Sequence, residues 1–213
     1  MKKKLSLAFA AMAVGGLMLG VSSAAQATVT NGTFDLTIDA CSGGCGLTDY
    51  GTITVTGNGS TETVSVTLNG GTVFHESAGA MTPSPGLYFD LAGTVSTFTI
   101  NSGTGFSASG AGSFSLDGFG TGNYAALCSG PNAGNTCGST LSFTITGSNL
   151  DFDFMTTSAH GAVLFVADVL GPNGGTGPVG APVPAPILGA GLPGLIAACT
   201  GLVVLARRRR KIA

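Results

Sequence analysis

The stretch Thr63-Val-Ser-Val-Thr-Leu68 alternates polar and apolar side chains with a period of two. Successive side chains of an extended strand point to opposite faces, so Val and Leu fall on one face and Thr and Ser on the other. This period predicts half-buried β-strands rather than amphipathic helices. The same alternation recurs at residues 34–38, 52–56, 87–91, 141–145 and 150–154.

Glycine and asparagine clusters separate these predicted strands, as at Gly57-Asn-Gly59 and Asn69-Gly-Gly71. Residues 162–169 are apolar on both faces and therefore predict a central strand. About ten short strands of this kind predict an all-β fold, an antiparallel β-sandwich that is jelly-roll-like rather than a closed barrel. We expect residues 28–170 to form this single domain.

Charge is scarce and unevenly placed along the 213 residues. Charged residues make up 8% of the chain, against about 25% in a typical protein. All eight basic residues lie in Lys2–Lys4 and Arg207–Lys211, whereas all ten acidic residues lie between Thr28 and Ala206. That acidic span repels phosphate backbones, which excludes nucleic acid as a partner. Within it, only a new α-amino group or a protonated histidine can pair with a carboxylate.

The N-terminus has the order of parts of an export signal. Three lysines precede an apolar run from Leu5 to about Val21, and Ala25-Gln-Ala27 forms a small-x-small cleavage site. We therefore predict a signal peptide over residues 1–27, removed by signal peptidase before Thr28. The alternative is an uncleaved membrane anchor.

The C-terminus has three parts. Residues 171–186 are rich in Gly and Pro and predict a linker, and residues 187–206 form an uncharged run of 20 residues. A helix of that length crosses about 30 Å of hydrocarbon, so we predict a transmembrane helix. Residues 207–213 form a basic tail, which stops transfer and stays cytoplasmic by the positive-inside rule. The stop-transfer residues are Arg207, Arg208, Arg209, Arg210 and Lys211.

This tail resembles the PEP-CTERM class of bacterial sorting signals, in which a Pro-rich motif, one transmembrane helix and an Arg cluster follow in order. The segment 181–186 looks like the VPLPA variant, with Ala181 and Val183 at its first and third places, and it lacks the Glu of the usual motif. The resemblance implies cleavage by an exosortase, a membrane transpeptidase with a Cys nucleophile, and delivery to the cell surface or an exopolysaccharide matrix. A simple single-pass anchor is the alternative. The motif residues are Pro182, Val183, Pro184, Ala185 and Pro186.

Four cysteines lie in the exported part, namely Cys41, Cys45, Cys128 and Cys137. An even number outside the cytoplasm predicts disulfides, with three connectivities open. We favour the local pairs 41–45 and 128–137, because each brackets Gly-rich turn residues. A four-thiolate zinc site is the alternative. Cys199 lies in the predicted transmembrane helix.

Candidate chemistry is sparse. His75 and Glu76 form a candidate acid–base pair, His160 precedes a turn, and no Gly-x-Ser-x-Gly motif is present. Asp151 and Asp153 share one face of a predicted strand, where they are candidate Ca²⁺ ligands. Without a catalytic constellation, we expect a non-enzymatic protein with no cofactor other than Ca²⁺.

The expected function is therefore that of an exported surface or exopolysaccharide-matrix protein. Before processing, the C-terminal helix would hold it in the inner membrane. Two alternatives stay open: a Ca²⁺-assisted module that binds carbohydrate or another partner, and a secreted hydrolase that uses His75, Glu76 or the Asp151 and Asp153 carboxylates.

Overall fold

The computed structural model describes residues 29–76, 84–116, 118–130, 135–157 and 159–183. The predicted signal peptide, transmembrane helix and basic tail lie outside these residues. All regular elements in the described part are β-strands, and no helix there is long and apolar enough to span a membrane. The strands are β1 (Gly32–Asp35), β2 (Ile38–Asp39), β3 (Gly51–Gly57), β4 (Thr61–Leu68), β5 (Val73–His75), β6 (Ser84–Ser102), β7 (Phe106–Ala108), β8 (Tyr124–Cys128), β9 (Thr136–Gly138), β10 (Thr140–Asp153), β11 (Met155–Thr157), β12 (Gly161–Leu170) and β13 (Thr176–Pro182).

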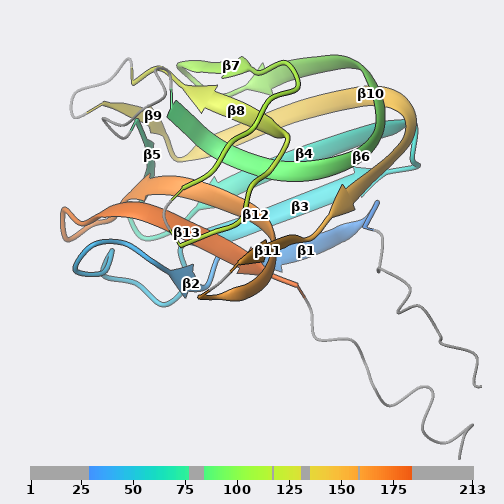
Figure 1. Cartoon of the computed structure of the whole chain (residues 1–213). Coiled ribbons are helices and arrows are strands. Elements are labelled where there is room, and N and C mark those ends of the chain that lie inside the picture. Colours follow the sequence, from blue (N-terminus) through green and yellow to red (C-terminus); the bar gives the residue numbers. More distant parts are fainter. Residues whose placement is uncertain (1–28, 77–83, 117, 131–134, 158, 184–213) are drawn as a thin grey trace, which may run out of the picture.

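The thirteen strands form one curled antiparallel sheet, in the order β1-β3-β4-β10-β6-β12-β13-β2 along its main path. The sheet folds over itself into two layers, as in a β-sandwich (Figure 1). We define the first layer as β1, β3, β4, β10 and residues 90–102 of β6. The second layer contains residues 84–89 of β6 and the other strands. The predicted all-β, antiparallel class is confirmed.

Strand β6 belongs to both layers. Its residues 84–89 pair with β8, and three of them also pair with β12, whereas Asp90 and the residues after it pair with β10. Gly93 allows the close pairing with β10 that follows, because it has a φ of +92° and a Cβ there would overlap the carbonyl oxygens of Ser148 and Asn149. β10 has an irregular register between Ser148 and Asp151, opposite the same point.

The side chain of Asn123 completes the hydrogen bonding where β6 leaves the second layer. β8 begins at Tyr124, which pairs with Phe89, so Leu91 lies beyond the end of β8. The Leu91 N–H donates to Asn123 Oδ1 at 2.9 Å, and Asn123 Nδ2 donates to the Leu91 carbonyl at 2.8 Å. One amide side chain thus makes both bonds that another strand residue would have made.

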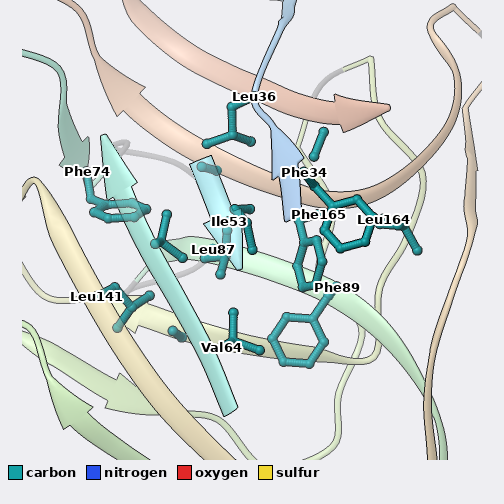
Figure 2. Close-up of a cluster of buried hydrophobic side chains, with 14 of the residues drawn as sticks. Phe34, Leu36, Ile53, Val64, Phe74, Leu87, Phe89, Leu141, Leu164 and Phe165 are labelled. Atoms are coloured by element: carbon teal, nitrogen blue, oxygen red, sulfur yellow. The ribbon is translucent and has the colours of Figure 1, made fainter. Parts of the chain in front are cut away.

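The main core lies between the two layers, and Phe89 packs at its centre. Its ring centroid lies 5.5 Å from that of Phe143 and 5.4 Å from that of Phe152, both on β10, and 5.9 Å from that of Phe165 on β12. Residues 53, 64 and 141 point into the same space, as their alternating sequence predicted (Figure 2). Aromatic contacts therefore join the layers across the core.

A second apolar cluster covers the outer face of the second layer. Tyr88, Val163 and Val166 point outward there and pack against Phe114 and Phe119 from the segment before β8. The Tyr88 hydroxyl donates to the Gly120 carbonyl at 3.0 Å and accepts the Leu116 N–H at 3.2 Å. This cover explains why residues 162–169 are apolar on both faces.

The predicted linker over residues 171–186 is wrong for residues 176–182, which form β13. This strand pairs with β12 on one side and with β2 on the other. The glycines before it allow close packing: a Cβ on Gly171 would overlap the Cys45 carbonyl, and one on Gly175 would overlap the Gly44 carbonyl. The folded domain therefore extends beyond residue 170 and includes the start of the predicted sorting motif.

We expect Asn123→Ala to lower the free energy of unfolding by about 1–3 kcal/mol, because it leaves the Leu91 backbone without both partners. Urea unfolding of the purified protein measures this. Asn101→Ala is the matched control, since that exposed amide makes one side-chain bond, to Thr144. An equal loss in both variants would contradict the role assigned to Asn123.

Candidate functional site

A shallow cleft of about 360 Å³ lies beside β6 and β8. Residues 95–98 of β6 form one side, residues 108–111 form the other, and Tyr124 of β8 completes it. The rings of Phe98 and Tyr124 meet edge to face, with centroids 6.5 Å apart. The position of the cleft follows from the fold, because residues 90–102 of β6 have already left the second layer while β8 remains in it.

The cleft offers aromatic and hydroxyl groups. Its hydroxyls come from Ser96, Thr97 and Ser109, and Ser109 Oγ accepts the Ala125 N–H at 2.8 Å. None of the described residues that line it is a carboxylate, an imidazole or a basic group. Such a lining suits a neutral, hydroxyl-rich ligand and offers no acid–base group that titrates near neutral pH.

Cross-strand hydroxyl pairs continue from the cleft over the outer face of the first layer. The hydroxyls of Thr97 and Thr146 lie 2.6 Å apart, and those of Thr63 and Thr144 lie 3.3 Å apart. These pairs join β6, β10 and β4 side by side. The polar half of the sequence alternation therefore forms a continuous hydroxyl-bearing face.

The four cysteines of the described domain form two local disulfides, Cys41–Cys45 and Cys128–Cys137, in agreement with the favoured pairing. The zinc alternative is wrong, since these sulfurs are bonded to one another. One group of three potential metal ligands occurs among the described residues, Asp39 with Cys41 and Cys45. Its two sulfurs belong to a disulfide and cannot act as thiolate ligands.

Asp39 instead organises the first disulfide loop. Its carboxylate accepts the N–H groups of Cys41 at 2.8 Å and Cys45 at 3.2 Å, and the Tyr50 hydroxyl at 2.5 Å. Partial burial alone would raise the pKa of Asp39, but these hydrogen bonds outweigh it, so the pKa is lowered. Burial of Tyr50, and then its hydrogen bond to Asp39, raise the pKa of the Tyr50 hydroxyl.

Asp151 and Asp153 lie on one face of β10, with Phe152 buried on the other, as predicted. Asp153 lies opposite Asp90 of β6, and burial followed by the charge of Asp153 raises the pKa of Asp90. Asp151 Oδ1 accepts the Val29 N–H at 2.7 Å. In the described part of the chain, no third ligand residue joins Asp151 and Asp153 within metal-binding distance. The Ca²⁺ hypothesis therefore has two carboxylates and no complete set of oxygen ligands.

Sequence reasoning missed Glu62. Its side chain is fully buried, with Oε1 accepting the Gly59 N–H at 2.7 Å and Oε2 making no hydrogen bond. Burial, and then the charge of Asp151, raises the pKa of Glu62. The signal was present in the alternation, because Glu62 is in phase with the inward-pointing Val64 and Val66.

The two histidines lie in separate parts of the second layer, His75 on β5 and His160 beside Phe119. His75 Nδ1 is buried without a hydrogen-bond partner. Glu76 follows the last residue of β5, and neighbouring side chains of a strand point to opposite faces. The ring of His160 stacks on Phe119, with centroids 5.0 Å apart, and so belongs to the cover of the second layer.

Some of the predicted processing residues lie within the described part of the chain, and the others lie outside it. Pro182 ends β13, and the Val183 N–H donates to the Ala162 carbonyl at 3.2 Å. Ala25, Ala27, Thr28, residues 184–186, Cys199 and the basic tail lie outside the described residues. Comparison with protein-family models, curated proteins and solved structures finds no match to this chain.

We expect Asp39 to stabilise the fold above its ordinary pKa of 3.8 and to lose that effect as the pH falls through its lower native pKa. Asp39→Asn should therefore be less stable than the unmodified chain at pH 7, and the gap should close in acid. Urea unfolding between about pH 2.5 and 7 measures it. Asp35→Asn controls for the loss of one negative charge, and a gap that is independent of pH would contradict the assignment.

Proposed function

We propose that this chain is a non-enzymatic exported protein that is sorted through its C-terminal signal. Signal peptidase would release residues 1–27, and residues 187–206 would hold the chain in the inner membrane. An exosortase-like enzyme would then cut in the Pro-rich motif and deliver a jelly-roll-like domain to the cell surface or exopolysaccharide matrix. The observation that carries this proposal is the ordered set of Pro-rich motif, apolar run and Arg207–Lys211 cluster.

Two structural features support the proposal. Disulfides persist in oxidising compartments outside the cytoplasm, and the domain has two of them. The backbone is bonded into the sheet as far as Val183, which lies directly before Pro184. Because a protease needs an accessible extended substrate, cleavage beyond Pro184 would remove the anchor without removing a strand.

Intact mass of the surface-associated protein tests the sorting step. We expect a chain that begins at Thr28 and ends between residues 184 and 187. A variant with Arg207–Lys211 replaced by Gln should instead keep its apolar segment, because its stop-transfer signal is lost. A surface form that retains residues beyond Arg207 would contradict exosortase processing.

The cleft beside Tyr124 favours a second candidate function, the binding of a neutral polysaccharide. Its edge-to-face aromatic rings can cover the apolar face of a sugar, while the hydroxyls of residues 96, 97 and 109 bond to the sugar hydroxyls. The proposed location in the exopolysaccharide matrix would place the protein beside such polymers. The outer hydroxyl face would extend the contact along a chain.

A glycan array followed by titration calorimetry tests this binding. Ala111→Trp fills the cleft from an exposed position and should reduce affinity at least about tenfold, the effect of losing about 1.4 kcal/mol. Thr121→Trp, on an exposed loop, should leave the affinity unchanged. Repeating the titration with a chelator tests the Ca²⁺-assisted form. No glycan bound in either condition would contradict the candidate.

A further inference from the structure

The turn between β3 and β4 contains the Asn–Gly step Asn58–Gly59. In such a step the backbone nitrogen of the glycine can attack the side-chain carbonyl carbon of the asparagine, because glycine has no side chain to hinder the approach. The product is a cyclic imide. The reaction is favoured by a base on the glycine N–H, by hydrogen-bond donors on the amide oxygen, and by an amide nitrogen that is free to leave.

Glu62 places a base on the Gly59 nitrogen. Its Oε1 accepts the Gly59 N–H at 2.7 Å, and its Oε2 is buried without a hydrogen-bond partner. The carboxylate reaches this position because Gly57 has no side chain, and a Cβ on Gly57 would overlap it. Burial raises the pKa of Glu62, and a base whose pKa lies closer to neutral accepts a proton more readily.

Hydrogen-bond donors surround the amide oxygen of Asn58. Asn58 Oδ1 accepts the Ser60 N–H at 3.0 Å, the Ser60 hydroxyl at 2.8 Å and the Thr61 N–H at 3.0 Å. These donors lie where negative charge develops once the glycine nitrogen attacks. Asn58 is exposed, and within the described part of the chain no hydrogen bond holds its Nδ2. Water can therefore reach the amide, and its nitrogen can leave.

The other Asn–Gly steps of the described chain lack this combination. They begin at residues 31, 69 and 173. Each of these asparagines donates its Nδ2 to another residue, respectively the Gly57 carbonyl, the Asp49 carboxylate and the Gly44 carbonyl. Among the described residues, no carboxylate accepts the N–H of the glycine that follows any of them. These steps therefore serve as controls within the same molecule.

We propose that Asn58–Gly59 is a self-modification site, with Glu62 as its general base. The Gly59 nitrogen bonds to Asn58 Cγ as its proton passes to Glu62 Oε1. The Cγ–Nδ2 bond then breaks, and the nitrogen takes up that proton and leaves as ammonia. Water opens the imide and gives aspartate or isoaspartate at position 58. Either product adds a negative charge, and isoaspartate also lengthens the backbone of the turn, so the modified hairpin of β3 and β4 is weaker.

The test follows each Asn–Gly step of the purified protein by peptide mapping and mass spectrometry at neutral pH. Pepsin makes the peptides, because the chain between Thr28 and Ala206 has no Lys or Arg for trypsin. A folded backbone restrains ring closure, so the steps at 31, 69 and 173 should react more slowly in the folded chain than in urea. The step at 58 should instead react at least about tenfold faster when folded, because only the folded chain holds the base in place.

Substitutions separate the base from the rest of the turn. Glu62→Gln should slow the step at 58 to its rate in the unfolded chain and leave the other steps unchanged. Ser60→Ala removes one donor to Asn58 Oδ1 without altering the base, and should slow the same step at least about threefold. Ser65→Ala, which removes an exposed hydroxyl of β4, is the matched control and should change no rate.

The comparison of folded and unfolded chains needs no variant, so it holds even where Glu62→Gln unfolds the protein. A step at 58 that reacts no faster in the folded chain than in urea overturns the proposal. An unchanged rate at 58 in folded Glu62→Gln overturns it as well.

Discussion

The structure depends on one strand being shared by two layers. β6 is hydrogen-bonded to the second layer through residues 84–89 and to the first through residues 90–102, so neither layer can form correctly without it. Phe89, at the change of partner, packs on rings from both layers. Asn123 satisfies the backbone that the change leaves exposed. The cleft beside Tyr124 is a product of the same divergence of β6 from β8.

A domain without Lys or Arg must obtain its order from other interactions. Hydroxyl pairs cross the strands of the first layer, and Asp39 bonds to backbone N–H groups rather than to cations. Glycines serve as points of close approach, as where the turn before β13 packs on the Cys41–Cys45 loop. Glu62 is the exception, because its Oε1 accepts the Gly59 N–H but its buried Oε2 makes no hydrogen bond.

Much of the fold was predictable because alternation is a local signal. It located parts of β1, β3, β4, β6 and β10, and the doubly apolar run at 162–169 became the buried strand β12. Bulges hid the continuity of β10, since each shifts the alternation by one residue. The glycines of 171–177 predicted a linker, because sequence alone does not show which backbone approaches them. The cleft could not be predicted from the sequence, because the three segments that line it meet only in the folded sheet.

The pairing of β13 with β2 sets an order of events. The last described strand closes against one of the first, with well over a hundred residues between them. Strand β2 cannot complete its pairing with β13 until residue 182 has emerged, whether from a ribosome or from a translocation channel. The second layer is therefore complete only when the whole domain has emerged. In a chain arrested earlier, the edge of β12 that pairs with β13 stays open to pairing with other strands.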